Sequence, residues 1–197
     1  MTSSNHTLST HRRRTQVFLL TLAAALAIAL AAVVPATAEA RGTRCKGAKK
    51  APGKLTAGQM RRATMCLINR RRHRAGLRTL RLDRSLRRAA TRHSANMVRR
   101  DFFSHYSPGG GSTQTRIGGT GYLSGARYFL FGEVIGGGTS RGGSPKRVMK
   151  AWMHSGPHRA AILNGSFRDL GVGVAHGYPG SGRRGATFTV DFGRRRG

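Results

Sequence analysis

The chain has almost no negative charge. It contains 6 Asp and Glu residues against 36 Lys and Arg residues, so its formal net charge at pH 7 is +30. A surface this cationic attracts polyanions such as teichoic acids, anionic lipid headgroups or nucleic acid. The arginines are spread along the sequence rather than gathered in one stripe, however, and a general use of arginine as a solvated charge also accounts for them. The charge therefore indicates no specific nucleic-acid partner, and it leaves anionic polymers or lipids of the cell envelope as candidate partners.

Cysteine is nearly absent as well. Cys45 and Cys66 are the two cysteines of the chain, and in an oxidising compartment one disulfide between them is the expected state. Such a bond would tie the segment that precedes the first helix to that helix. Two free thiols are the alternative that the sequence leaves open.

Long apolar runs are confined to the N-terminus. Residues 11–14 are basic, residues 17–34 are apolar, and small residues follow as far as Ala40, which is the pattern of a cleavable signal peptide over residues 1–40. The alternative is an uncleaved anchor, because the apolar run reaches the roughly 17 residues that can span a bilayer. In either case the rest of the chain lies outside the cytoplasm. With cleavage we expect a secreted, extracellular monomer without a membrane span.

The remaining sequence predicts a short arm followed by one domain. Residues 41–56 are basic and polar and lack hydrophobic periodicity, which predicts a flexible arm. Residues 57–197 are enough for one hydrophobic core and too few for two. We detect no internal repeat in them.

Hydrophobic periodicity predicts three helices. Apolar residues recur at helical spacing from Met60 to a stop at Gly76, and a second helix follows an N-cap at Asp83. His93 lies on the apolar stripe of this second helix, so we expect a buried histidine that is hydrogen-bonded to a neighbour. A third helix starts at the Ser-Pro pair that begins with Ser144.

The other segments predict strands, which makes the fold class α+β. Residues 170–175 and 186–192 alternate apolar with small or polar residues, which is typical of an antiparallel hairpin. The stretch over residues 102–143 is too long for a structureless loop, so we expect a short helix and a strand in it. Two acidic residues near the hairpin strands are expected to pair with arginines: Asp191 with one of the many in the chain, and Asp169 with Arg168 or Arg159.

Because acids are scarce, one carboxylate is conspicuous. Glu133 lies in the glycine-rich stretch FGEVIGGG, and a histidine is found on either side of it along the chain: His105 in FFSHYSP and His158 in WMHSGPHRAAILN. Ser155 precedes His158 by three residues. A lone glutamate between two histidines indicates a functional cluster rather than surface charge.

Seven segments in this order resemble the bacterial, secreted branch of the CAP superfamily, whose domains are also called SCP domains. The family is named for cysteine-rich secretory proteins, antigen 5 and pathogenesis-related 1 proteins. The segments are CLINRRRHRAGLRTLRLDRSL, AATRHSANMVRRDFFSHYSP, RIGGTGY, GEVIGGG, VMKAWMHSGPHRAAILN, FRDLGVGVAHG and TVDFG.

The resemblance implies an α-β-α sandwich, in which helices cover both faces of a small antiparallel sheet. It also implies a cleft lined by two histidines and one or two glutamates. His105 matches the first histidine, Glu133 the first glutamate and His158 the second histidine, while Ser155 stands where eukaryotic relatives have the second glutamate. Val134 departs from the family pattern, because many relatives have asparagine after the glutamate.

Three hypotheses for the function follow. The first is a non-catalytic ligand-binding or interaction module, and the resemblance implies small apolar, lipid-like ligands for it. The second is a metal-assisted hydrolase, in which His105, Glu133 and His158 hold a divalent metal such as zinc, the one cofactor these residues suggest. The third is a non-specific binder of polyanions. A Ser155–His158 nucleophile pair lacks any recognisable orienting acid or oxyanion hole, so the sequence assigns no catalytic residue.

Overall fold

The computed structural model describes residues 44–181 and 184–197. Residues Arg44–Gly197 form one compact unit. The predicted signal peptide over residues 1–40 and the first three residues of the predicted arm lie outside the described residues. Within the described ranges, no helix combines the length and the apolar character that crossing a membrane requires.

A four-stranded sheet lies at the centre of this unit, with strand order β1-β3-β4-β2. β3 (Asp169–His176) and β4 (Ala186–Arg196) are antiparallel neighbours, which confirms the terminal hairpin. β2 (Tyr128–Gly138) runs antiparallel along the other side of β4. β1 (Arg81–Leu82) pairs in parallel with β3. The sheet is therefore mixed, because this two-residue strand adds one parallel pair to the antiparallel sheet that the resemblance implied.

Alternation along the strands gives the sheet two different faces. Phe188, Val190 and Phe192 of β4 belong to the main hydrophobic core. The residues that alternate with them are also buried but are polar: Thr187, Thr189 and Asp191. Because successive side chains of a strand point to opposite faces, one face of the sheet is apolar and the other carries small and polar side chains.

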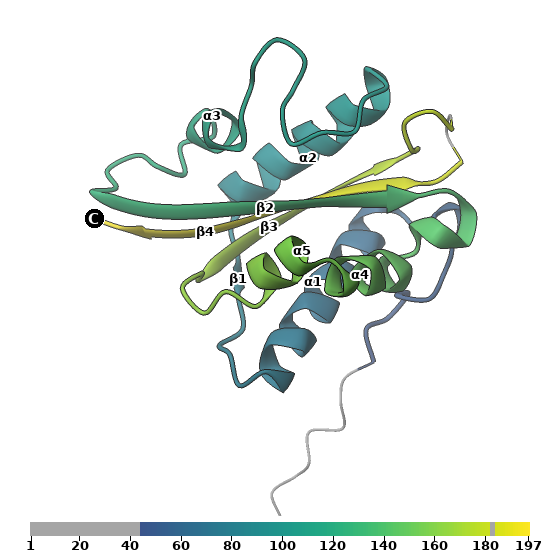
Figure 1. Ribbon diagram of the computed structural model, residues 1–197, viewed down its shortest axis with the longest axis horizontal. Helices are drawn as coiled ribbons and strands as arrows, with labels where there is room; N and C mark the ends of the chain where they lie inside the picture. The colour runs from purple at the N-terminus through teal and green to yellow at the C-terminus, as the bar shows by residue number, and fades with distance from the viewer. Residues whose placement is uncertain (1–43, 182–183) are drawn as a thin grey trace, which may run out of the picture. The chain divides into compact units, whose positions relative to one another are not determined.

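Three helices cover the apolar face: α1 (Ala57–Arg74), α4 (Pro145–His154) and α5 (Gly156–Ile162). Figure 1 shows them together on one side of the sheet. Trp152 of α4 is almost fully buried, and its indole Nε1 donates a hydrogen bond to the carbonyl of Ile135 on β2 at 2.7 Å. This contact fixes α4 against the strand that carries Glu133.

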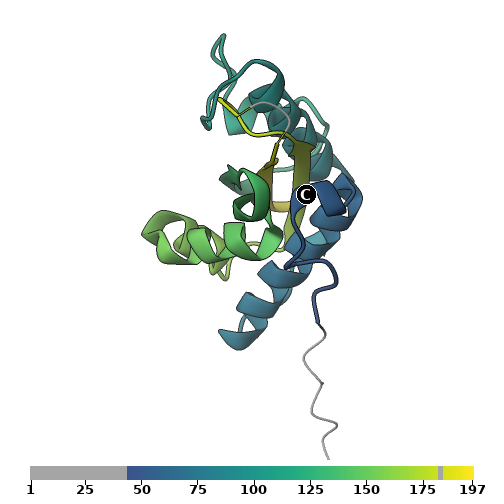
Figure 2. The ribbon, with the colours of Figure 1, turned by 90° about the vertical axis from the view of Figure 1, so that its right-hand side faces the viewer.

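Two helices cover the polar face: α2 (Arg84–Arg99) and α3 (Thr113–Gly118). They complete the three layers of an α-β-α sandwich, which Figure 2 shows from the side. The carboxylate of Asp83 caps α2 by accepting hydrogen bonds from the amides of Ser85 and Leu86, as the sequence predicted. The expected α+β sandwich is therefore confirmed.

Two glycines allow α2 to lie against the sheet. A Cβ atom at Gly171 would meet the backbone of Leu86 and Arg87, and one at Gly173 would meet the backbone of Ala90. Both glycines belong to β3. Since only glycine lacks a Cβ atom, the helix can approach the strand this closely only at such positions.

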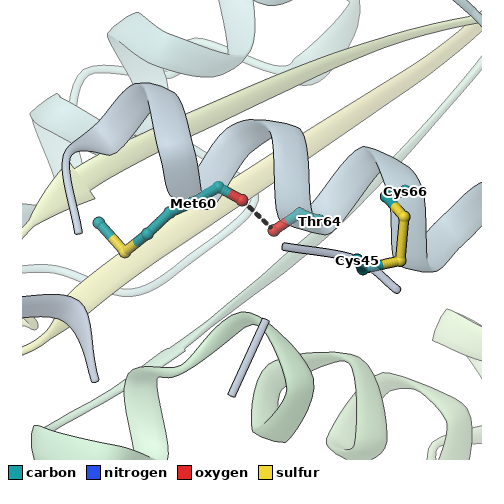
Figure 3. Close-up of a disulfide and its surroundings, with 4 residues drawn as sticks. All are labelled: Cys45, Met60, Thr64 and Cys66. Atoms are coloured by element: carbon teal, nitrogen blue, oxygen red, sulfur yellow. Dashed lines mark hydrogen bonds between the residues drawn. A yellow bond between two sulfur atoms is a disulfide. The ribbon is translucent and has the colours of Figure 1, made fainter. Parts of the chain in front are cut away.

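From Arg44 onward the predicted arm contacts the domain. Cys45 forms a disulfide with Cys66 of α1, as predicted (Figure 3). Ala48 is buried, and its carbonyl accepts a hydrogen bond from the amide of Lys146 at 2.8 Å. A short 3₁₀ helix, η1 (Pro52–Lys54), then leads into α1. The arm has few apolar residues, but the disulfide and these contacts hold it against the domain.

Candidate functional site

His105 and Glu133 meet beside β2. His105 lies in the loop after α2, and its Nδ1 is 2.7 Å from Oε1 of Glu133. A carboxylate can only accept hydrogen bonds, so Nδ1 carries the proton and donates it. The side chain of Glu133 is 2% exposed, whereas that of His105 is 44% exposed. The carboxylate is therefore interior, and the histidine offers its second ring nitrogen, Nε2, toward the surface.

α3 supplies two further partners of the same carboxylate. Arg116 donates from Nη2 to Oε2 of Glu133 at 2.6 Å, and the Thr113 hydroxyl donates to Oε1 at 3.1 Å. Arg116 also donates from Nη1 to the carbonyls of His105 and Gly111, both at 2.9 Å. One guanidinium thus holds the glutamate and the histidine loop in place together.

Arg116, like Thr113, is a site residue that the sequence did not single out. It opens the segment RIGGTGY, which was used only as part of the resemblance. A signal was present, because Thr113 and Arg116 are three residues apart and residues at this spacing lie on one face of a helix. A charged residue that shares a face with a hydroxyl on a short helix is a candidate partner for a scarce carboxylate.

The environment keeps Glu133 ionised. Burial acts to raise its pKa, but the hydrogen bond from His105 and the charge of Arg116 outweigh burial, and the pKa is lowered. His105 and Arg116 together stabilise the charged form of Glu133 more than desolvation disfavours it. Glu133 is thus an anion throughout the physiological pH range.

Asp191 lies directly opposite Glu133 in the β2–β4 register. It is fully buried, and neither carboxyl oxygen has a hydrogen-bond partner among the described residues. Burial, and then the negative charge of Glu133, raise the pKa of Asp191 well above its usual range. The expected ion pair with an arginine is therefore wrong. The alternation of β4 points this carboxyl under α2, and we infer that it is protonated there.

Asp169 forms no ion pair with Arg168 or Arg159 among the described residues. Its Oδ1 lies 3.2 Å from Nη2 of Arg81 on the exposed edge of the sheet, and its Oδ2 accepts a hydrogen bond from the Tyr122 hydroxyl at 2.9 Å. Asp169 therefore has an arginine partner as expected, but this partner is Arg81 rather than Arg168 or Arg159. The residue belongs to the sheet edge rather than to the Glu133 cluster.

His93 of α2 is buried below the cluster. Its Nε2 is 2.9 Å from the carbonyl of Ser104, so this nitrogen carries the hydrogen and donates it. Burial lowers the pKa of His93, and the charge of Arg116 adds to this effect. The histidine is therefore neutral at pH 7. The prediction of a buried, hydrogen-bonded histidine is confirmed.

His158 and Ser155 form a separate pair. His158 Nδ1 is 2.9 Å from the Ser155 hydroxyl, and Ser155 is the junction between α4 and α5. Burial lowers the pKa of His158, and the charge of His105 contributes to the lowering. No hydrogen bond joins His158 to Glu133 or His105 in the described part of the chain. The structure thus hydrogen-bonds His105 to Glu133 and His158 to Ser155, while the charge of His105 still acts on His158.

A hollow of about 460 Å³ opens beside the His105–Glu133 pair. Besides those two residues, its lining includes Tyr106, Gln114 and Phe131. Tyr106 is 67% exposed, so an aromatic ring stands at the rim. We refer to this space as the Glu133 hollow.

The residues around Glu133 fit a metal ion poorly. No group of three His, Cys, Asp or Glu side chains gathers as a metal-binding set within residues 44–181 and 184–197. Oε1 of Glu133 accepts from His105 and Thr113, and Oε2 accepts from Arg116. A divalent cation would have to displace the guanidinium and would meet its positive charge nearby.

Comparison with known proteins places these features in a family. The model of the cysteine-rich secretory protein (CAP) family matches residues 65–192. The Bacillus subtilis protein YkwD is 34% identical over 143 residues, which cover 73% of this chain and 51% of YkwD. The B. subtilis membrane protein YlbC is 31% identical over 105 residues, covering 52% of this chain and 28% of YlbC. The chain thus spans about half, or less, of these relatives.

Two solved structures share the fold. An outer surface protein of Borrelia burgdorferi superposes with a TM-score of 0.60 at 20% identity, covering 72% of this chain and 97% of that one. An extracellular SCP-domain protein of Bacillus anthracis superposes with a TM-score of 0.53 at 28% identity, covering 70% and 43%. The first similarity concerns the fold alone.

Proposed function

Since this chain belongs to the cysteine-rich secretory protein (CAP) family, we propose that it is a secreted, non-catalytic binding module with the Glu133 hollow as its ligand site. The single observation that carries the proposal is the state of the Glu133 carboxylate. All of its partners are protein groups, and Arg116 neutralises its charge. A carboxylate held in this way shapes the wall of a pocket and is a poor ligand or base.

The hollow offers mixed chemistry to a ligand. Phe131 and the exposed Tyr106 supply apolar surface, while Gln114 and His105 Nε2 supply polar groups at the rim. A volume of about 460 Å³ is within the range of small-molecule pockets, roughly 300–1,000 Å³. These properties favour a small, partly apolar, lipid-like molecule with one polar end.

Secretion is supported by two observations. The sequence predicts a signal peptide over residues 1–40, and the similar B. anthracis protein is an extracellular one. N-terminal sequencing of the protein from culture supernatant tests this. A chain that starts just after Ala38 or Ala40 is expected, and a chain found only in the cells with its N-terminus intact would contradict secretion.

A ligand titration tests the binding site. A fluorescent fatty-acid analogue should bind the wild type, and Tyr106→Ala should weaken this binding about tenfold, because a well-placed aromatic contact is worth about 1–2 kcal/mol. Tyr128→Ala is the matched control, since Tyr128 is 50% exposed and does not line the hollow. Equal loss in both variants, or no binding by the wild type, would contradict the proposal.

A metal-assisted hydrolase is the second candidate, and one observation favours it. His105 donates to a buried carboxylate through Nδ1 and leaves Nε2 toward solvent, which is how a carboxylate orients a metal-binding histidine. Ester and amide hydrolysis should be measured with added zinc and with chelator. We expect no turnover above buffer in either condition; zinc-dependent turnover that His105→Ala abolishes would favour this candidate over binding.

A further inference from the structure

Folding gathers basic residues that the sequence spreads apart. A groove of about 780 Å³ lies between the arm and the start of α4. Its charged lining residues are all basic, and we refer to them as the cationic groove: Lys49, Lys50, Lys54, Arg141, Lys146 and Arg147. An adjoining hollow of about 840 Å³ shares three of these lysines. No acidic residue lines either space among the described residues, so the positive charge there is not neutralised by the protein.

An unused hydroxyl lies in the same groove. Ser144 is the N-cap residue of α4 and is 3% exposed, yet its side chain does not cap the helix. It forms no other side-chain hydrogen bond with a described residue, and it lines the groove. Pro145 follows it at the first helical position. The start of α4 therefore places a serine hydroxyl that does not cap the helix, and the positive end of the helix dipole, beside the basic side chains.

The two walls of the groove are held together. The arm is fixed to α1 by the Cys45–Cys66 disulfide, and the Ala48 carbonyl accepts from the Lys146 amide at 2.8 Å. Pro52 of η1 packs on Gly143, at the end of the 3₁₀ helix η2 (Ser140–Gly143). The lysines of the arm and the arginines near α4 therefore keep their spacing, which a merely basic, mobile tail would not achieve.

We propose that the cationic groove is a binding site for the phosphate groups of a linear polymer of phosphates, with Ser144 donating to a phosphate oxygen. Its groups are donors: ammonium, guanidinium and hydroxyl. A phosphate presents several acceptor oxygens and a full charge, and Lys and Arg form strong charge-assisted hydrogen bonds with it. A polymer of such groups can occupy the groove and the adjoining hollow at once. The site is separate from the Glu133 hollow, so neither proposal depends on the other.

A pair of matched double variants tests the site. Lys50→Gln with Arg147→Gln removes two exposed charges of the groove, and Arg84→Gln with Arg92→Gln removes two exposed charges of α2 on the opposite face of the sheet. Binding of labelled polyphosphate is measured by fluorescence anisotropy at about 0.15 M salt, where charges more than about 8 Å apart are largely screened. The groove variant should bind about tenfold or more weakly, and the control within about twofold of wild type. Equal loss in both would mean attraction by net charge alone and would overturn the proposal.

Three further measurements separate the site from its alternatives. Ser144→Ala should weaken polyphosphate binding several-fold without a change in its salt dependence, because a neutral donor is lost. Vesicles of anionic phospholipid are the second probe. If vesicles bind through the groove while polyphosphate does not, the ligand is a membrane surface and the polymer proposal is wrong. Reduction of the disulfide in wild type should also weaken polyphosphate binding; unchanged binding would show that the arm does not help to form the site.

Discussion

At the residue scale, Arg116 determines what Glu133 can do. Glu133 stood out in the sequence because acids are scarce, and His105 and His158 because they lie on either side of it along the chain. Two of these three residues do meet. The sequence could not show that the guanidinium of Arg116, from a helix of six residues, binds the same carboxylate. The spacing of Arg116 and Glu133 along the chain matches neither the helix nor the strand period, so nothing in the sequence indicated that they meet. Their meeting is a property of the tertiary fold.

Removing the carboxylate should destabilise the protein. Glu133→Gln leaves the guanidinium of Arg116, 12% exposed, without its counter-charge, and breaking a buried pair on one side costs about 3 kcal/mol. Because the pKa of Glu133 is lowered in the fold, its contribution is present at neutral pH and is lost as pH falls through the folded pKa. Urea unfolding at pH 7 should show the loss, and it should shrink in acid.

Asp101→Asn is the control for this prediction. Asp101 is exposed, and the amide oxygen of asparagine can keep the hydrogen bond that Oδ1 accepts from the Gly180 amide. Its cost should stay within about 0.5 kcal/mol. A Glu133→Gln variant as stable as this control would contradict a structural role for the carboxylate.

The buried carboxyl of Asp191 should make stability depend on pH in the opposite sense. Its pKa is raised by folding, so the folded state holds the proton more tightly, and the contribution of Asp191 to stability falls as pH rises from about 4. Asn cannot titrate, so the stability of Asp191→Asn relative to wild type should increase between about pH 4 and 7, by at most about 1.4 kcal/mol per pH unit. Urea unfolding of both proteins across this range gives the two curves. Parallel curves would show that Asp191 titrates as it does in the unfolded chain.

At the element scale, α2 and β3 depend on glycines that periodicity alone does not explain. The alternation over residues 170–175 predicted the strand, and its glycines were read as the small partners of the apolar residues. The structure adds that Gly171 and Gly173 face the backbone of α2. The positions of α1, α2 and α4 and the hairpin were predictable from spacing and caps. α5 was not predicted, because its Gly-Pro start reads as a helix break, and β1 has two residues and too little pattern to be detected.

Filling this contact should disrupt the packing of α2. Gly173→Ala places a methyl group against the backbone of Ala90, and overpacking that the backbone must absorb costs about 3 kcal/mol or more. Gly53→Ala is a suitable control, because nothing lies within 4 Å of its Cβ position. Thermal unfolding should show a large decrease in Tm for the first variant and little for the second. Equal Tm values would mean that α2 can shift away from the sheet without loss.

At the scale of the whole molecule, the arm is part of the domain. Composition predicted flexibility for residues 41–56, because basic and polar residues rarely form a core. The disulfide and the hydrogen bond of the Ala48 carbonyl hold the arm against the domain from Arg44 onward. The same fold gathers the lysines of the arm with arginines that lie far along the chain, which composition could not show.

Opening the disulfide should lower the stability of the whole domain. Its cysteines are 21 residues apart, and closing a loop of that size restricts the unfolded chain by about 3 kcal/mol. Urea unfolding of the reduced protein, or of Cys45→Ala with Cys66→Ala, should show a decrease of that order. A change below about 0.5 kcal/mol would indicate that the remaining contacts of the arm suffice.

Zinc titration by calorimetry tests most directly whether the carboxylate of Glu133 is closed to metal ions. We expect no heat above that of buffer at neutral pH, for wild type and for His105→Ala alike, because Arg116 and the other partners already engage both oxygens of Glu133. Stoichiometric binding of zinc to wild type that His105→Ala removes would show that Glu133 and His105 form a metal site, which would contradict this expectation.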